Sequence, residues 1–188
     1  MQGCTEKLDA ILQSILEYSY NNRYDLKIEA VDIRTLVDDC FTNLADVPGI
    51  RAVEKRIEVH QSKKLQLDRH RLELIFKHLL KNAIQFRDTH KQHSIIHITV
   101  KVADSLEISV RDNGTGIKRA HLPKVFDMFY RASNQSQGAG LGLYITKEVV
   151  TKLKGKIEVQ SHLGKGTIFI ITIPITKIMY SSKRKKSK

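Results

Sequence analysis

The stretch "SVRDNGTGI", residues 109–117, sets an aspartate beside two glycines at the end of an alternating segment. Asn-Gly in such a position is a common signal for a tight β-hairpin. A hairpin needs a second alternating strand, yet residues 118–137 show no alternation and include a proline. The other interpretation is that Gly114 and Gly116 leave the backbone bare, so that a flat ligand can approach Asp112 closely.

A second glycine-rich stretch, "GAGLGL" at residues 138–143, opens the helix that the following residues predict. Unpaired amide hydrogens and the positive end of a helix dipole favour an anion there, and glycines let the backbone close around it. The same pattern also suits a flexible loop. No Gly-Lys-Ser/Thr follows and no strand precedes it, which excludes a Walker loop and a Rossmann turn.

A third position that could do chemistry is Asn82, beside the apolar stripe of the helix "DRHRLELIFKHLLKNAIQFRD". An asparagine amide oxygen is a neutral ligand, suited to one position on Mg²⁺ whose other ligands are water and phosphate oxygens. A solvated helix surface is the ordinary alternative for an isolated asparagine. The three features together could bind a nucleotide. Asn82 would hold a metal ion, Asp112 would recognise the base, and the start of the glycine-opened helix would bind phosphate.

The elements that must position these groups mix helices with strands. The periodicity predicts helices at 69–86 and from 142 onward, and strands at 56–60, 94–102, 106–112, 156–160 and 166–174. The order indicates an α/β fold whose neighbouring strands are mostly antiparallel. The long irregular segment at 118–140 is typical of a lid or binding loop, so we expect function near it.

The first residues predict a helix that stands apart from this pattern. Its apolar stripe, which needs a packing partner, consists of Leu8, Ile11, Leu12, Ile15 and Tyr18. A polar stretch then precedes Asp32, a predicted N-cap of a second helix. We therefore divide the chain into a helix with its linker at 1–24, a compact domain at 25–176 and a basic tail at 177–188.

Composition narrows the class of protein. The formal charge of the 188-residue chain is +12, but it falls to +7 without the five basic residues at 183–188. That tail has no aromatic residue, which favours a solvated terminus over an electrostatic contact. The spacing of Cys4 and Cys40 matches no metal-binding or redox motif. Two ordinary thiols are what a protein of a reducing compartment is expected to have. With no spanning helix or secretory signal visible, we expect a cytoplasmic segment, whose parent can still be membrane-anchored.

Four stretches resemble, in order, the N, first glycine, F and second glycine boxes of sensor histidine kinases: "HLLKNAIQF", "DNGTGI", "VFDMFYR" and "GAGLGLYITKEVV". The resemblance covers roughly residues 26–174, and "LDAILQSILEYSY" resembles the second helix of the family's dimerisation hairpin. It implies a two-layer α/β sandwich of the Bergerat type, shared with gyrase, chaperone and mismatch-repair ATPases. It also implies ATP and Mg²⁺ as cofactors, with ATP lying beneath a mobile lid.

The resemblance assigns roles to individual residues. Asp112 is expected to accept a hydrogen bond from the adenine amine, which disfavours guanine. Asn82 is expected to hold Mg²⁺, and Arg131 and His78 to act in phosphoryl transfer. The resemblance also places eleven further residues around the nucleotide: Phe86, Gly114, Gly116, Ile117, Tyr130, Gly138, Gly140, Leu141, Gly142, Leu143 and Thr167.

The chain departs from the family pattern at two positions of the N box. His78 stands where the family usually has asparagine, and Gln85 where it usually has lysine, which removes one phosphate-facing charge. His78 can contact the metal or phosphate, or pack as an ordinary helix residue. None of the eight histidines precedes an acidic residue, as the family's acceptor histidine does. We therefore expect a catalytic portion that begins with the second hairpin helix and phosphorylates a histidine outside it.

The implied partners are a response regulator receiver domain and, through the hairpin helices of the parent protein, a second copy. We expect no specific nucleic acid and no membrane contact. Two alternatives remain. An ATP-hydrolysing module of the gyrase or mismatch-repair type would want a carboxylate at position 78 to activate water. A basic nucleic-acid-binding domain would use the positive charge but leave Asp112 and both glycine stretches unexplained.

Overall fold

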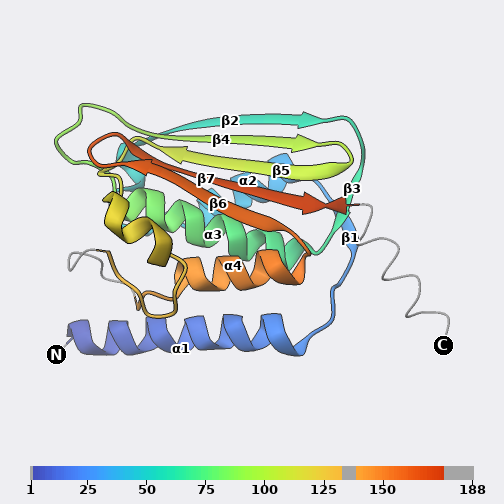
Figure 1. The fold of residues 1–188 in the computed structure, drawn as a ribbon, viewed down its shortest axis with the longest axis horizontal. Helices are drawn as coiled ribbons and strands as arrows, with labels where there is room; N and C mark the ends of the chain where they lie inside the picture. The colour runs from blue at the N-terminus through green and yellow to red at the C-terminus, as the bar shows by residue number, and fades with distance from the viewer. Residues whose placement is uncertain (1, 133–138, 176–188) are drawn as a thin grey trace.

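The computed structural model describes residues 2–132 and 139–175, with no side chain described for 2–7 and 10. Figure 1 shows three layers: a sheet, a middle layer of helices, and the N-terminal helix on the far side of that layer. The first two layers form the two-layer α/β sandwich that the sequence predicts, preceded by a helix, so the predicted fold class is confirmed.

The main sheet has five strands in the order β2-β4-β5-β7-β6. Strand β2 (Val53–Gln61) is parallel to β4 (Ser94–Val102), whereas β4 is antiparallel to β5 (Ser105–Asp112). Strands β7 (Gly166–Pro174) and β6 (Lys156–His162) continue the antiparallel part. The sheet is therefore mixed and mostly antiparallel, as the alternating segments of the sequence indicate.

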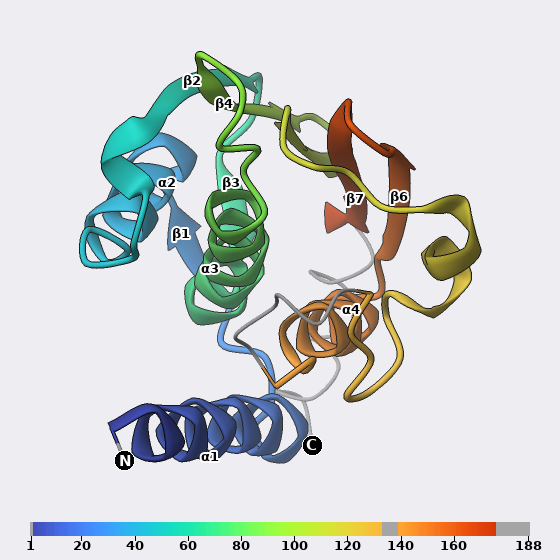
Figure 2. The same ribbon diagram turned by 90° about the vertical axis from the view of Figure 1, so that its left-hand side faces the viewer.

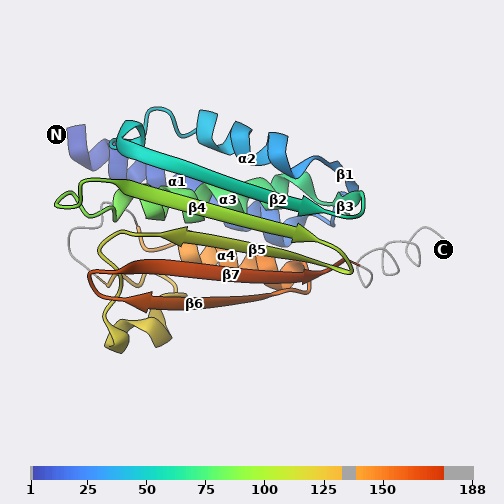
Figure 3. The ribbon, with the colours of Figure 1, turned by 90° about the horizontal axis from the view of Figure 1, so that it is seen from above.

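Helices cover one face of this sheet, and within the described residues no helix covers the other face (Figures 2 and 3). The covering helices are α2 (Ile33–Thr42), α3 (Arg69–Gln85) and α4 (Gly142–Lys152). Helix α1 (Gln2–Arg23) lies across α3 and α4 on the side away from the sheet. Among the described residues, none of the helices combines the length and apolar character that crossing a bilayer requires.

Alternation along the strands and a broad stripe on α3 build the core between sheet and helices. Every second residue of β4 and β5 faces the helices and is buried, as the sequence predicts: Ile96, Ile98, Val100, Val102, Leu106, Ile108 and Val110. The stripe of α3 and the inner face of α4 supply the opposite wall: Leu72, Ile75, Phe76, Leu79, Leu80, Ile145, Val149 and Leu153. This packing fixes both ends of α3 against the sheet.

Four short elements complete the fold. Strands β1 (Glu29–Val31) and β3 (Leu65–Leu67) form a separate antiparallel pair. Two 3₁₀ helices, η1 (Ile50–Ala52) and η2 (Arg119–Lys124), lie in connections. Segment 118–140 is therefore not wholly irregular, because η2 occupies its first part.

Side-chain caps begin the two helices that follow the linker. The Asp32 carboxylate accepts a hydrogen bond of 2.8 Å from the Thr35 amide, which confirms the predicted N-cap of α2. Asp68 caps α3 in the same way, accepting from the Arg71 amide at 3.0 Å. Asp68 also accepts from the Lys27 amide at 2.9 Å and so ties the linker to α3.

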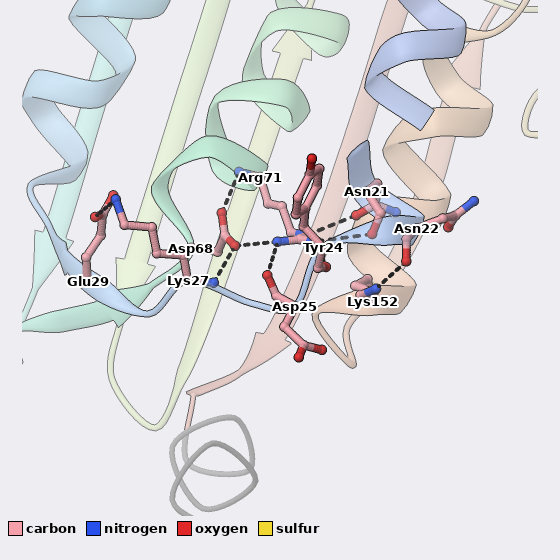
Figure 4. A network of polar contacts seen from close by, with 9 residues as sticks. All are labelled: Asn21, Asn22, Tyr24, Asp25, Lys27, Glu29, Asp68, Arg71 and Lys152. Atoms are coloured by element: carbon pink, nitrogen blue, oxygen red, sulfur yellow. Dashed lines mark hydrogen bonds and ion pairs between the residues drawn. The ribbon is translucent and has the colours of Figure 1, made fainter. Parts of the chain in front are cut away.

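A fully buried arginine fastens the C-terminal end of α1 to α3 (Figure 4). The Arg71 guanidinium forms an ion pair with Asp68 and donates to the side chain of Asn21 at 3.0 Å. It also donates to the carbonyls of Asn21, Tyr24 and Asp25 at 3.1, 2.7 and 3.3 Å. The last carbonyls of a helix have no donors within the helix. A cation at that end can donate hydrogen bonds to them and is attracted by the negative end of the helix dipole. Arg71 therefore fixes where α1 ends.

Helix α1 makes further contacts with α4. Lys152 donates to the carbonyl of Asn22 at 3.2 Å, and the rings of Tyr18 and Tyr144 lie 5.7 Å apart. A hydrogen bond with Tyr18 raises the pKa of Tyr144 to about 12. The apolar stripe of α1 behaves differently, because Leu8, Leu12 and Ile15 are each at least half exposed. The domain is thus contacted mainly by the polar C-terminal part of α1.

Candidate functional site

One face of α3 connects the candidate residues. His78, Asn82 and Phe86 follow one another at intervals of four, so they lie one above the other on the same side of the helix. Each interval spans about 6 Å. A Cβ atom added to Gly142 would lie 3.1 Å from Nδ1 of His78, and one added to Gly114 would lie 2.3 Å from the Phe86 carbonyl oxygen. Asn82 therefore lies between the two glycine stretches.

Asp112 ends strand β5 with one carboxylate oxygen held by the backbone. Its Oδ1 accepts from the amides of Gly114 at 2.8 Å and Thr167 at 3.3 Å. Within the described part of the chain no hydrogen bond reaches Oδ2, which is left to accept from a ligand. Burial raises the pKa of Asp112, while the two amides and the charge of Lys91 act in the opposite direction. The carboxylate is thus oriented and only partly solvated.

The loop after Asp112 has the close approaches that its glycines indicate. Gly116 has a φ of +68°, and a Cβ there would lie 2.1 Å from the carbonyl oxygen of His162. The next amide, of Ile117, donates to the Ser161 hydroxyl at 2.8 Å. That hydroxyl lies 2.9 Å from Oγ1 of Thr167, whose own amide reaches Asp112. The loop is held between α3 and the β6–β7 turn, and the described residues 113–132 contain no strand that could form a hairpin with β5.

The second glycine stretch opens α4 as predicted. Gly140 has a φ of +73°, and a Cβ there would lie 2.8 Å from the carbonyl oxygen of Tyr130, so the chain turns sharply against the preceding segment. Leu141 is buried and precedes the first helical residue, Gly142, while Leu143 is partly buried. Among the described residues, no side-chain cap is found at this end of α4. The first amides of a helix have no partner within the helix and can donate to an anion.

His78 is buried rather than open to the site, and a residue of α1 reaches it. Its Nε2 lies 3.0 Å from Oε2 of Glu17, which is also buried. Oε1 of Glu17 accepts from Lys77 at 2.6 Å. Burial raises the pKa of Glu17, but the contacts with His78 and Lys77 outweigh it and bring the value to about 2. Glu17 is thus ionised at neutral pH, beside the helix face that carries Asn82.

The segment before α4 is only partly described. Oη of Tyr130 lies 2.6 Å from Nδ1 of His121, a contact that ties residue 130 to η2. Arg131 is exposed, and Phe129, also exposed, has a φ of +62°. Gly138, one of the predicted nucleotide-binding residues, lies outside the described residues.

The donor set around Asn82 fits a magnesium ion bound mainly through a ligand's phosphates. In the described ranges no three His, Cys, Asp or Glu side chains converge on one metal position. Mg²⁺ in nucleotide sites keeps several waters and takes phosphate oxygens and one or two protein ligands. The amide oxygen of Asn82, a partly buried residue between the two glycine stretches, is a ligand of that kind.

Three contributing residues have no signal in the sequence. Glu17 lies on a different predicted segment from His78, and its contact with α3 depends on how α1 docks. Ser161 and Lys91 lie in ordinary polar stretches, and their roles depend on the turns that bring them to the Asp112 loop. Only the spatial arrangement shows that these side chains belong to the site.

Comparisons with known proteins agree with this geometry. Residues 67–177 match the family model described as "Histidine kinase-, DNA gyrase B-, and HSP90-like ATPase". The chain is 28% identical over 180 residues to the sensor histidine kinase MtrB of Mycolicibacterium paratuberculosis, covering 92% of this chain and 31% of that protein. It is 34% identical over 151 residues to a probable C4-dicarboxylate sensor kinase of Bacillus subtilis, covering 76% of this chain and 28% of that protein. The chain thus spans about a third of the length of these relatives.

A solved structure shares the fold. The structure of full-length ShkA in complex with AMPPNP superimposes with a TM-score of 0.75 at 22% sequence identity. The match covers 89% of this chain and 35% of that one. The superposition thus covers more of this chain than the family model does.

Proposed function

The chain belongs to the family of histidine kinase-, DNA gyrase B- and HSP90-like ATPases and is a catalytic domain of the histidine kinase type, and from this premise we propose how its residues act. It binds ATP with Mg²⁺ and transfers the γ-phosphate to a histidine outside this chain. The observation that carries the proposal is the single face of α3, on which Asn82 lies between the Asp112 loop and the glycine-opened start of α4.

Asp112 is the group that selects the base. Its Oδ1 is fixed by two backbone amides, so Oδ2 is oriented to accept a hydrogen bond from the exocyclic amine of adenine. Guanine would present a carbonyl oxygen to the same carboxylate, and two acceptors repel each other. Gly114 and Gly116 keep the loop free of side chains, so that the flat ring can lie close to the backbone.

The phosphate end uses the start of α4. Amides after Gly140 and the positive end of the helix dipole stabilise phosphate oxygens, and Leu141 and Leu143 anchor this turn to the core. Arg131 lies on the segment facing this end and is suited to neutralise charge that develops during transfer. Asn82 would hold Mg²⁺, which when bound supplies positive charge at the phosphates.

His78 takes a positional role in this arrangement. Its ring is buried between Glu17 and Gly142, so it shapes the wall between α3 and α4 and does not face outward to a metal ion. Glu17 thereby links the phosphate end to α1.

The partners of the longer protein follow from its relatives. We propose that it forms a dimer through the helix to which α1 belongs and passes its phosphate to a response regulator receiver domain. The exposed apolar residues of α1 support a helical packing partner: Leu8, Leu12, Ile15 and Leu16. We also propose that the domain works in the cytoplasm, where ATP is available.

Titration calorimetry tests the proposed function. ATP and ADP should bind this chain, GTP should bind at least about tenfold more weakly, and Mg²⁺ should strengthen ATP binding. Equal affinity for ATP and GTP would contradict the role of Asp112, and absence of adenine nucleotide binding would contradict the function itself.

A further inference from the structure

The side chain of Lys91 reaches the loop that follows Asp112. Lys91 lies in the connection between α3 and β4, and its Nζ donates to the carbonyls of Asn113 at 2.6 Å, Gly164 at 2.7 Å and Gly114 at 3.3 Å. An ammonium group has three donors, and these three carbonyls use all of them. The side chain is only 31% exposed, so the charge is directed into the protein.

The three acceptors belong to two segments that must meet for the base site to exist. Asn113 and Gly114 follow strand β5, whereas Gly164 lies in the β6–β7 turn. The Gly164 amide also donates to the carbonyl of Thr115 at 2.7 Å, which joins the two segments, and the Thr115 amide donates to the carbonyl of Phe86 at 3.0 Å, which joins the loop to the end of α3. Bonds from a charged donor are about twice as strong as neutral ones, so the bond from Lys91 to Gly164 is stronger than the neutral bond from Gly164 to Thr115.

We propose that Lys91 is a positioning residue of the base site, which holds the Asp112 loop against the β6–β7 turn so that the carboxylate faces the base. The inference rests on the proposed function, since it concerns how that site selects adenine. The connection holds the loop from one side by two means. Lys91 binds the carbonyls, and the Asn113 side chain accepts from Ile95 at 2.8 Å and donates to the carbonyl of His93 at 2.8 Å.

Electrostatics add to the geometry. The charge of Lys91 lowers the pKa of Asp112 against the larger effect of burial, which favours the ionised form that the base requires. Other charged or titratable groups near this loop include Asp88, 3.9 Å from the Lys91 ammonium, and His93, whose carbonyl accepts from Asn113. Arg111 and Lys118 flank the loop in sequence, and His162 at the end of β6 and Lys165 in the β6–β7 turn are both exposed. Strand β7 and helix α3 contribute the uncharged residues Thr167 and Phe86.

The test compares Lys91→Met, which keeps the stem and removes the donors, with two other variants. Lys91→Arg retains a cation with several donors. Lys63→Met removes an exposed ammonium, 2.6 Å from Asp104, at the opposite end of β5. ADP and GTP binding are measured by calorimetry from pH 8 to pH 5, with thermal unfolding of each variant.

Lys91→Met should weaken ADP binding by about tenfold and reduce the preference for ADP over GTP. It should also move the acid loss of ADP binding to higher pH, because Asp112 would protonate more readily without the neighbouring cation. Lys91→Arg should restore most of the affinity, and Lys63→Met should bind within about twofold of the parent chain.

Two results would overturn the inference. If Lys91→Met binds ADP with the affinity, preference and pH profile of the parent chain, Lys91 does not position the base site, whatever its effect on stability. If the parent chain itself binds no adenine nucleotide, the proposed function fails and this inference fails with it. The parent chain measured alone distinguishes the second result from the first.

Discussion

At the scale of single residues, the role of Asp112 is the easiest to test by substitution. Asp112→Asn removes a charge-assisted acceptor from a partly buried site and should weaken ATP binding by on the order of 1 to 3 kcal/mol. It should weaken GTP binding far less, because guanine does not use that acceptor. Calorimetry at neutral pH measures both.

The matched control for this variant is Asp104→Asn, an exposed carboxylate just before the start of the same strand. It should leave nucleotide affinity unchanged. An Asp112→Asn chain that unfolds at the parent's temperature and binds ATP as tightly as the parent would rule out adenine recognition by Asp112.

The sequence indicates Asp112, Gly114, Gly116 and the glycine-opened helix because each of these needs a special residue type at its own position. A position with a positive φ, or in close contact with another backbone segment, requires glycine, and glycine can be recognised in the sequence. Lys91 and Glu17 leave none, because lysine and glutamate are common surface residues and their partners are far away in sequence. Position within the fold, rather than residue type, gives these two their roles.

At the scale of elements, the contact between α1 and α3 depends on pH through Glu17. Its pKa in the folded protein is about 2, below the ordinary value of 4.5. A carboxylate with a depressed pKa stabilises the fold fully above its unfolded-state value, and this contribution is lost as the pH falls from about 4.5 towards 2. Acid should therefore loosen the docking of α1.

Glu17→Gln tests this dependence. At pH 7 the substitution should lower the free energy of unfolding by on the order of 1 to 2 kcal/mol, since a buried charge-assisted hydrogen bond to Lys77 is lost. Between pH 5 and pH 3 the variant should lose less stability than the parent chain. Urea unfolding at several pH values measures both effects. Asp9→Asn, an exposed carboxylate on the same helix, should retain the parent's pH profile, and a Glu17→Gln profile identical to the parent's would contradict this account.

Long periodic elements are predictable from the sequence and short ones are not. Strands β4 and β7 and helix α3 lie within one or two residues of their predicted bounds, because each carries several apolar residues at one period. Strand β3 has three residues, too few to show a period, and exists because β1 pairs with it. The parallel pairing of β2 with β4 also needs the tertiary structure, since nothing local distinguishes it from an antiparallel pair.

At the scale of the whole molecule, the chain should bind ATP without labelling itself. None of its histidines precedes an acidic residue, and transfer requires the γ-phosphate to be held in line with a nucleophile. Incubation with γ-labelled ATP and Mg²⁺ should therefore leave the chain essentially unlabelled. Calorimetry on the same sample shows that nucleotide is bound. Strong acid-labile labelling of the chain alone would show that one of its own histidines is an acceptor.

The buried clamp around Arg71 makes α1 a lever with its fulcrum beside the nucleotide site. The contacts described above for this helix involve residues from Glu17 to Tyr24, in its C-terminal part and just beyond its end. The 22-residue helix is about 33 Å long, so a tilt of about 10° at the clamp moves its far end by about 6 Å. Because the N-terminal end of α1 is far from the clamp, a small force applied there would act on the Glu17–His78 contact as a larger force. Small strains on α1 would thus be concentrated where α3 and α4 meet.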